Sequence, residues 1–287
     1  MRSEPGSVQD LRRAGSLPVG VGLIALAVWL AISLLLVAFP GIDIEVSRLF
    51  CSGKRLFSGQ AVGWVKVVRG VFAAIFFASV AATLAGLVLT RGGTRRWLRL
   101  RSLQWWYLAV CLAVGPGLVA NVGFKNHWGR ARPNDIVEFG GKKAFTPALL
   151  PTDQCDSNCS FISGEAAAAF VPFYALGVVC PQWAGLLFAA GTVSGLTAGL
   201  VRVSQGGHFL SDVVFAGLFM LLTVFVIHLA GFRPRPASER AGAQPRCVPD
   251  GAPEPLSERV ARAKQSRPSR RLAAARYLRR ARLGERS

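Results

Sequence analysis

The sequence predicts an all-α polytopic membrane protein with six transmembrane helices. Hydrophobic residues make up 52% of its 287 residues, and they are segregated into long stretches instead of being mixed with charged residues as in a soluble domain. The segments Leu17 to Pro40 and Gly70 to Thr90 contain no ionisable residue. About 20 such residues are enough for a helix to cross roughly 30 Å of hydrocarbon. Basic residues are concentrated in a few segments outside these stretches, which indicates a fixed orientation in the membrane.

The predicted spans follow one another along the chain and cover about residues 17–40, 69–90, 104–124, 162–181, 183–201 and 209–230. The first span follows a short basic segment, an arrangement that secretory signal peptides share. Its apolar core is too long for a signal peptide, and no small-residue cleavage pattern follows Phe39-Pro40. We therefore expect an uncleaved anchor.

Glycine and proline are placed to shape two of the spans. Gly115-Pro116-Gly117 should bend the third span, because proline removes a backbone hydrogen-bond donor. Gly191, Gly195 and Gly199 form a ridge of small residues on the fifth span, and such a ridge lets helices approach closely. Packing within the bundle and formation of a homodimer are the two uses expected for it.

Three regions divide the chain: a cytoplasmic N-terminal segment (1–16), a membrane domain (17–230) and a C-terminal tail (231–287). The tail mixes Pro, Ser, Ala and Arg and is predicted to be largely disordered. Its segment Arg270 to Leu283 is expected to be either a basic helix on anionic lipid or a solvated anchor of the topology.

The formal net charge of +19 is explained by membrane orientation instead of nucleic-acid binding. Of the 34 Lys and Arg residues, 15 follow Gly231, five lie between Arg91 and Arg101, and three precede Leu17. With an even number of spans, these segments lie on one side of the membrane. The positive-inside rule makes that side the cytoplasm, so both termini are predicted to be cytoplasmic. The predicted outward loops are 41–68, 125–161 and 202–208.

Six cysteines occur, at positions 51, 111, 155, 159, 180 and 247. Cys111 and Cys180 lie in apolar segments and are expected to be inert core residues. Cys155 and Cys159 share an outward loop, where a disulfide can persist. A zinc site is the alternative, but no histidine lies at a suitable spacing. Cys51 is a further candidate partner for either of these two cysteines.

Polar residues that could bind a substrate or take part in a reaction lie near the predicted outward ends of the spans. They form three groups: Lys125 to Pro133 after the third span, Cys159 to Glu165 at the start of the fourth, and Arg202 to Asp212 between the fifth and sixth. All three groups are predicted to lie at the same membrane depth on the same side. Each residue alone has an ordinary structural interpretation, such as a topology marker or a helix-end side chain. Their coincidence favours one functional site.

The residue types in these groups suit a phosphate. A phosphoryl group in transfer spreads negative charge over its equatorial oxygens, so its site needs fixed cations and backbone donors. Lys125, Arg132 and Arg202 are available cations, and arginine matches phosphate through its bidentate fork. Ser163 is placed to cap the fourth span, where free N–H groups and the positive dipole end favour an anion.

His208 and Asp212 are four residues apart and therefore predicted to lie on one face of the sixth span. A carboxylate bonded to one imidazole nitrogen fixes the tautomer and leaves the other nitrogen free to attack phosphorus. The pattern thus indicates His208 as nucleophile and Asp212 as the residue that orients it. Ionisable residues beside a membrane span are functional candidates by default.

The three groups resemble the signature of the type 2 phosphatidic acid phosphatase superfamily, which is K-x6-RP, then PSGH, then SR-x5-H-x3-D. The first and third motifs are matched at Lys125, Arg132, Pro133, Arg202, His208 and Asp212. Val201 stands where serine is usual. The resemblance covers about residues 65–230 and implies the six-span helical bundle of that superfamily.

This resemblance implies hydrolysis of a phosphomonoester or diphosphate through a phosphohistidine, with no metal or other cofactor. The phosphate would be held by Lys125, Arg132, Arg202, Ser163 and the Gly164 backbone. His208 would attack the phosphorus, with Asp212 in support.

The second motif departs from the family pattern. Ile162 replaces its proline, and Glu165 replaces the histidine that protonates the leaving oxygen in the family. A glutamate can do this only when protonated; burial raises a carboxyl pKa, whereas nearby cations lower it. We expect a catalytic or substrate-orienting role for Glu165, the alternative being a favourable interaction with the helix dipole. His127 is a second candidate for the missing acid, and His228 lies at the opposite end of its span.

The Ser-Gly-Glu variant preceded by two cysteines resembles a bacterial subgroup that includes lipid A phosphatases acting at the 4′ position. The expected protein is therefore an inner-membrane lipid phosphatase with a periplasmic active site, acting on lipid A and needing the bilayer but no nucleic acid. Undecaprenyl diphosphate, phosphatidylglycerol phosphate and phosphatidic acid are the alternative substrates. A phosphate-transferring enzyme and a non-catalytic lipid-phosphate binding protein are the alternative functions.

Overall fold

The structure, a computed structural model, describes residues 8–91 and 96–231, with side chains described from Gly20 onwards. The predicted tail from residue 232, which includes Cys247 and Arg270 to Leu283, lies outside the described residues, as do residues 1–7. The division of the chain into N-terminal segment, membrane domain and tail therefore stays a prediction.

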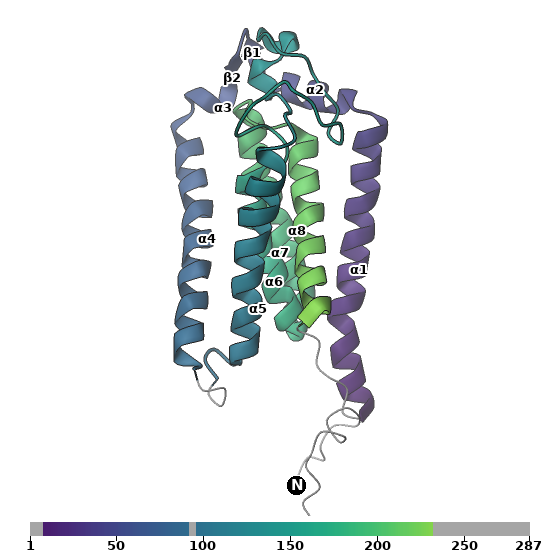
Figure 1. Cartoon of the computed structure of the whole chain (residues 1–287), viewed down its shortest axis with the longest axis vertical. Helices are drawn as coiled ribbons and strands as arrows, with labels where there is room; N and C mark the ends of the chain where they lie inside the picture. Colours follow the sequence, from purple (N-terminus) through teal and green to yellow (C-terminus); the bar gives the residue numbers. More distant parts are fainter. Residues whose placement is uncertain (1–7, 92–95, 232–287) are drawn as a thin grey trace, which may run out of the picture. The chain divides into compact units, whose positions relative to one another are not determined.

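Long helices run alongside one another in the described part of the chain (Figure 1). They are α1 (Val8–Ala38), α4 (Gly63–Leu89), α5 (Ser102–Ala113) continued by the π-helix η1 (Val114–Lys125), α6 (Gly164–Val179), α7 (Ala184–Ser204) and α8 (Leu210–Gly231). Each coincides with one of the predicted spans. The prediction of an all-α, multi-span membrane protein is confirmed.

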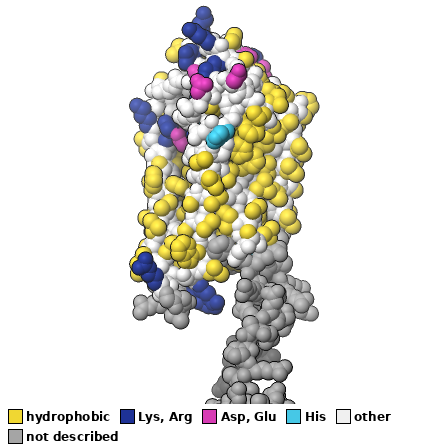
Figure 2. All heavy atoms as spheres, viewed as in Figure 1, with side chains coloured by type: hydrophobic (Ala, Val, Ile, Leu, Met, Phe, Trp, Pro, Cys, Tyr) yellow, Lys and Arg dark blue, Asp and Glu magenta, His cyan; other side chains and the backbone are white. Residues whose placement is uncertain are grey.

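Hydrophobic side chains cover much of the flank of the bundle, and Lys and Arg side chains gather towards its ends (Figure 2). Among the described residues, five helical segments are long and apolar enough to cross a membrane: Gly20–Ala38, Gly63–Leu89, Ser102–Lys125, Pro181–Ser204 and Leu210–Gly231. The sixth segment, α6, is apolar but has 16 residues. At 1.5 Å per residue it extends only about 24 Å.

The short helix α6 is sheltered by its neighbours. Phe170 and Tyr174 on it are fully buried, and the Trp29 Nε1–H of α1 donates a hydrogen bond of 3.1 Å to the Tyr174 hydroxyl. The helix packs closely against α7 and α8. A helix surrounded by protein need not match the thickness of the lipid, because its ends meet protein groups that satisfy the backbone.

The glycine ridge of α7 is used inside the bundle. A Cβ atom on Gly195 would lie 2.2 Å from the Phe170 ring of α6, and one on Gly199 would lie 2.1 Å from Val213 of α8. These distances are far below van der Waals contact, so only glycine permits the helices to approach this closely. The first of the two expected uses of the ridge is therefore observed. A homodimer stays a prediction, and it would need a different surface.

The segment Gly115-Pro116-Gly117 lies near the start of η1, where the helix widens from α to π geometry. The Asn121 side chain donates a hydrogen bond of 2.8 Å to the Pro116 carbonyl. Single π-helical turns inside helices are frequent at functional sites. Here the widened segment ends at Lys125, one of the predicted phosphate ligands.

Short elements cover one end of the bundle (Figure 1). They are α2 (Gly41–Arg48), the hairpin β1 (Cys51–Gly53) and β2 (Leu56–Phe57), α3 (Ser58–Ala61), and the 3₁₀ turns η2 (Pro133–Asp135) and η3 (Val137–Phe139). A small core of buried residues holds this cap to the start of α8, and it consists of Phe57, Ala131, Ile136, Phe139 and Phe209. A further 3₁₀ turn, η4 (Pro181–Trp183), connects α6 and α7. The predicted site residues lie at the capped end.

Candidate active site

The start of α6 forms one wall of the site. Ser163 is the N-cap, and its hydroxyl accepts the Ala166 N–H at 3.4 Å. A Cβ atom built on Gly164 would lie 3.3 Å from Lys125 Nζ, so the ammonium lies directly over the first turn of the helix. Free backbone N–H groups, the positive dipole end and a lysine thus converge where an anion would bind.

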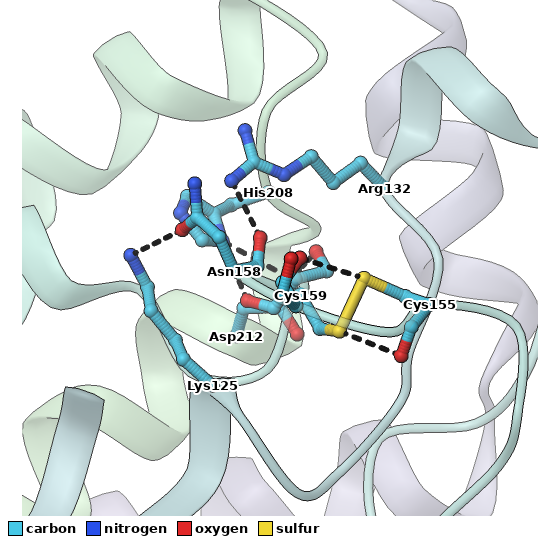
Figure 3. Close-up of a disulfide and its surroundings, with 9 residues drawn as sticks. Lys125, Arg132, Cys155, Asn158, Cys159, His208 and Asp212 are labelled. Atoms are coloured by element: carbon cyan, nitrogen blue, oxygen red, sulfur yellow. Dashed lines mark hydrogen bonds and ion pairs between the residues drawn. A yellow bond between two sulfur atoms is a disulfide. The ribbon is translucent and has the colours of Figure 1, made fainter. Parts of the chain in front are cut away.

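Two of the predicted cations are held by one residue of the loop before α6. Lys125 Nζ donates to the Asn158 side-chain oxygen at 3.3 Å, and Arg132 Nη2 donates to the Asn158 carbonyl at 2.7 Å (Figure 3). Arg202, near the end of α7, is held by Gln205 through a hydrogen bond of 2.6 Å. These contacts fix the directions of long, flexible side chains and so lower the entropy that phosphate binding would remove.

Asn158 belongs to a loop closed by a disulfide between Cys155 and Cys159, whose Cα atoms are 5.6 Å apart (Figure 3). The third candidate, Cys51, is a free thiol. The disulfide closes a five-residue loop around the asparagine that holds Lys125 and Arg132. The cross-link therefore restrains the side of the site on which these two cations lie.

His208 lies in the turn before α8 and is almost completely buried. Its Nδ1 is 2.7 Å from the Ser160 carbonyl oxygen. Because a carbonyl can only accept, the hydrogen must be on Nδ1, which leaves the lone pair on Nε2. Burial lowers the pKa of His208 below its ordinary value, although Asp212 opposes this effect. A neutral imidazole with a free Nε2 is the form that can attack phosphorus.

Asp212 lies on the first turn of α8 and is fully buried. One of its oxygens accepts hydrogen bonds from the Ser160 hydroxyl at 2.5 Å and the Phe209 N–H at 2.8 Å. The same oxygen is 3.6 Å from His208 Nδ1, which is longer than a hydrogen bond. The sequence suggested that Asp212 bonds directly to the imidazole of His208 and orients it. In the structure, the Ser160 carbonyl makes that bond instead. Asp212 faces the ring as a charge and holds Ser160 in place.

Glu165 lies on the first turn of α6 and is bound by two arginines. Its two oxygens accept hydrogen bonds of 2.7 Å and 2.9 Å from Arg69 of α4, and one of them is 3.4 Å from Arg202 Nε. The two side chains of the Arg69–Glu165 pair are 38% and 40% exposed, so the pair is open to a ligand. A bidentate arginine pair stabilises the ionised carboxylate, which then has no proton to donate.

A groove of about 530 Å³ begins at this pair and extends between α4, η1 and α6. Its polar lining includes Arg69, Asn121, Lys125 and Glu165, and its apolar lining consists mainly of Phe72, Phe76, Phe77 and Ala73 of α4 and Ala168 of α6. The groove therefore joins a charged end beside the cations to an aromatic wall on a membrane-spanning helix. Within residues 8–91 and 96–231, no group of three or more His, Cys, Asp and Glu side chains could hold a metal ion.

The structure brings together all eight residues predicted for the site. The start of α6 is joined to α8 because the Ser163 N–H donates to the Asp212 carbonyl at 3.2 Å. Sequence reasoning missed Asp43, Arg69, Arg130, Asn158 and Ser160. Arg69 carried a usable signal, because a charged residue at the start of a membrane span calls for a partner. Arg130, Asn158 and Ser160 carried no sequence signal except that they lie in or near a motif. Asp43 is not near any motif.

Comparison with known proteins gives a consistent result. The model of the PAP2 superfamily matches residues 104–236. Lipid A 4′-phosphatases of Rhizobium etli and Rhizobium leguminosarum are each 34% identical to the chain, over 74% and 70% of its length and 87% and 92% of theirs. The lipid A 4′-phosphatase of Francisella tularensis subsp. novicida is 44% identical over 45% of the chain and 59% of its own length. No solved structure matches the chain significantly.

Proposed function

The chain belongs to the PAP2 superfamily, and from that premise we propose that it is an integral membrane phosphatase that hydrolyses the 4′-phosphate ester of lipid A. The observation that carries the proposal is the state of His208. Its Nδ1–H is bonded to the Ser160 carbonyl, which leaves the Nε2 lone pair available, and the ring lies close enough to Lys125 and Arg202 to feel both charges. The similarity to three lipid A 4′-phosphatases supports the choice of substrate.

The proposed reaction has two steps. The phosphate is held by Lys125, Arg132 and Arg202, by the Ser163 hydroxyl and by the Gly164 N–H. Nε2 of His208 attacks the phosphorus, and the bond between phosphorus and the sugar oxygen breaks. Water then hydrolyses the phosphohistidine and frees the imidazole. In the net reaction, one water supplies the hydrogen of the sugar hydroxyl and the hydroxyl of the released phosphate.

Purified protein in detergent, incubated with lipid A phosphorylated at both the 1 and 4′ positions, tests this function. We expect release of one phosphate per lipid, and tandem mass spectrometry should locate the loss at the 4′ position. Undecaprenyl diphosphate, phosphatidylglycerol phosphate and phosphatidic acid serve as the comparison panel. If one of these lipids were hydrolysed faster than lipid A, that lipid would be the substrate instead of lipid A. Phosphate found on a second lipid instead of in solution would indicate a transferase, and an inert protein would indicate a binding protein.

For Glu165 we propose a substrate-orienting role. Its carboxylate is engaged by Arg69 and Arg202, and with Arg69 it forms the polar end of the groove. In this arrangement the pair receives the hydroxyl and amide groups of the sugar, while an acyl chain follows the aromatic wall.

Replacing Glu165 by glutamine should therefore act on binding. We expect the KM to rise about 10-fold with little change in kcat, because a contact made equally in ground and transition states is weakened. Arg69→Gln should have a similar effect, and the double variant should be no worse than either single one, because the two residues act as a unit. Glu138→Gln, at an exposed site of the cap, is the matched control. If kcat instead fell about 100-fold or more at unchanged KM, Glu165 would be the leaving-group acid, since about that factor belongs to general acid catalysis.

We further propose that the capped end faces the periplasm and that both termini are cytoplasmic. The concentration of basic residues before Leu17 and between Arg91 and Arg101 supports this orientation. In intact cells, a membrane-impermeant thiol reagent should label Gln154→Cys but not Arg101→Cys, with the unmodified protein as background. The reverse labelling pattern would overturn the orientation.

A further inference from the structure

Arg130 is a fully buried arginine at the centre of the cap, and every nitrogen of its guanidinium makes a hydrogen bond. Nε donates to the Thr146 carbonyl at 2.9 Å, and Nη1 donates to the Ser211 hydroxyl at 2.8 Å and to Asp212 at 2.5 Å. Nη2 donates to Asp43 at 2.8 Å. The guanidinium also lies 4.4 Å from the centroid of the Phe209 ring. The desolvation of this cation is thus compensated by two carboxylates, which keep its pKa high despite burial.

Asp43 reaches this cluster from α2, far from the phosphatase motifs in the sequence. It is 2% exposed, and besides Arg130 it accepts the Ser211 backbone N–H at 2.8 Å and the Ser211 hydroxyl at 2.5 Å. Burial raises the pKa of Asp43, and the charge of Arg130 counters this. Asp43 lies outside the segment 104–236 that the family model matches.

The cluster connects α2 to the imidazole of His208 through a chain of short contacts. Asp43 holds Arg130, Arg130 holds one oxygen of Asp212, and the other oxygen of Asp212 holds the Ser160 hydroxyl. The Ser160 carbonyl in turn accepts the Nδ1–H of His208. The hydrogen bonds of Asp43 go to Arg130 and Ser211, so its effect on the imidazole must pass through these two residues.

Stability alone is a poor explanation for this arrangement. A buried carboxylate–guanidinium–carboxylate cluster costs several kcal/mol in desolvation per ion, and well-packed apolar residues often serve a fold equally well. What apolar residues cannot do is fix the orientation of a carboxylate and, through it, of a carbonyl.

We propose that Asp43 and Arg130 are positioning residues for His208, which hold the imidazole in the Nδ1–H tautomer with Nε2 free. The consequence for turnover rests on the proposed phosphatase function, whereas the consequence for the tautomer does not. Asp43, the residue at the far end of this chain of contacts, therefore lies in the part of the cap that precedes α4 in the sequence.

Nuclear magnetic resonance of the full chain with ¹⁵N-labelled histidine tests the tautomer directly, and the chain has only 3 histidines. The wild type should show His208 as a single Nδ1–H tautomer, whose signal His208→Gln removes. In Asp43→Asn this signal should become a mixture of tautomers. Ser47→Ala is the matched control, because Ser47 is buried on the same helix and its hydroxyl has no hydrogen-bond partner among the described residues. An unchanged single tautomer in folded Asp43→Asn would overturn the proposal.

Kinetics supply the second readout. Asp43→Asn should lower kcat about 10- to 100-fold, the range expected when a reacting group is slightly misplaced. The KM and the inhibition constant of inorganic phosphate should change less than about twofold, because the phosphate ligands are untouched. Asp43→Asn combined with Arg130→Lys should be no slower than Arg130→Lys alone. Equal losses of kcat and phosphate affinity would indicate general disruption and overturn the proposal.

Should Asp43→Asn fail to fold, Asp43→Glu preserves the charge and displaces it by one methylene. A mixed tautomer in that variant supports the positioning role, and a single tautomer contradicts it. Failure of the proposed function is a separate outcome, since it appears as a wild type that releases no phosphate from any lipid of the panel.

Discussion

Replacing His208 by alanine should abolish phosphate release, with kcat lowered by at least about 10³-fold, because the variant lacks the atom that bonds to phosphorus. The Ser160 carbonyl engages Nδ1 and leaves Nε2 free, in a buried position beside the predicted phosphate ligands. Phosphate release from lipid A in detergent measures the loss. Rapid acid-free denaturation of wild type with ³²P-labelled substrate should also trap an acid-labile phosphoprotein that His208→Ala does not form.

His127→Ala is the matched control for this experiment. His127 lies in the first motif and its Nδ1 is 2.8 Å from the Val122 carbonyl, a contact similar to that of His208, but its side chain is exposed. The variant should retain the wild-type kcat. If His127→Ala lost activity because the phosphoprotein formed slowly or not at all, His127 would be a candidate for the missing acid, since the leaving oxygen is protonated in the step that forms the phosphohistidine. Equal activity of His208→Ala and wild type would refute the nucleophile assignment.

The residues that the sequence predicted to meet, and that lie together in the structure, share a property that a sequence can express. Each of them is close to the end of a span that the charge pattern assigns to the outside, so membrane depth alone predicts that they meet: Lys125, Ser163, Arg202 and His208. His208 and Asp212 were predicted to share one face of a helix, but His208 lies in the turn before α8. The two side chains still face each other because this turn leads directly into the first turn of the helix. Local periodicity and the length of apolar runs also define the helices, which explains the agreement of the spans.

The remaining site residues depend on tertiary contacts that no local pattern encodes. Asp43 is 168 positions away from Ser211, with which it makes two hydrogen bonds, and Arg69 is 96 positions away from Glu165. The first motif specifies Lys125, Arg132 and Pro133 but leaves position 130 open, although the cation of Arg130 is fully buried in the cap. The sequence could not decide between the catalytic and the substrate-orienting role of Glu165 for the same reason: whether its carboxyl carries a proton depends on Arg69, which the motif does not contain.

Asp212→Asn is expected to have the second largest effect and to lower kcat by about 10²- to 10⁴-fold, by analogy with the loss of an orienting carboxylate in hydrolase triads. In the wild type, Arg130 donates to one oxygen, while the Ser160 hydroxyl and the Phe209 N–H donate to the other. Asparagine has one oxygen and one NH₂ group, so in either orientation its NH₂ faces a donor. The substitution also removes the negative charge 3.6 Å from the imidazole, which becomes cationic on phosphorylation.

Two measurements separate these consequences. The unpaired buried donor should lower the free energy of unfolding by about 1–3 kcal/mol, seen as a lower Tm in detergent. The kinetic loss should exceed what this destabilisation explains, because it persists at temperatures where the variant is fully folded. Asp135→Asn is the matched control, since Asp135 pairs with Arg55 in a more exposed salt bridge of the cap and such pairs contribute at most about 1 kcal/mol. An Asp212→Asn variant with wild-type kcat would show that the charge facing His208 has no part in the reaction, and the orientation of the imidazole would then depend on the Ser160 carbonyl alone.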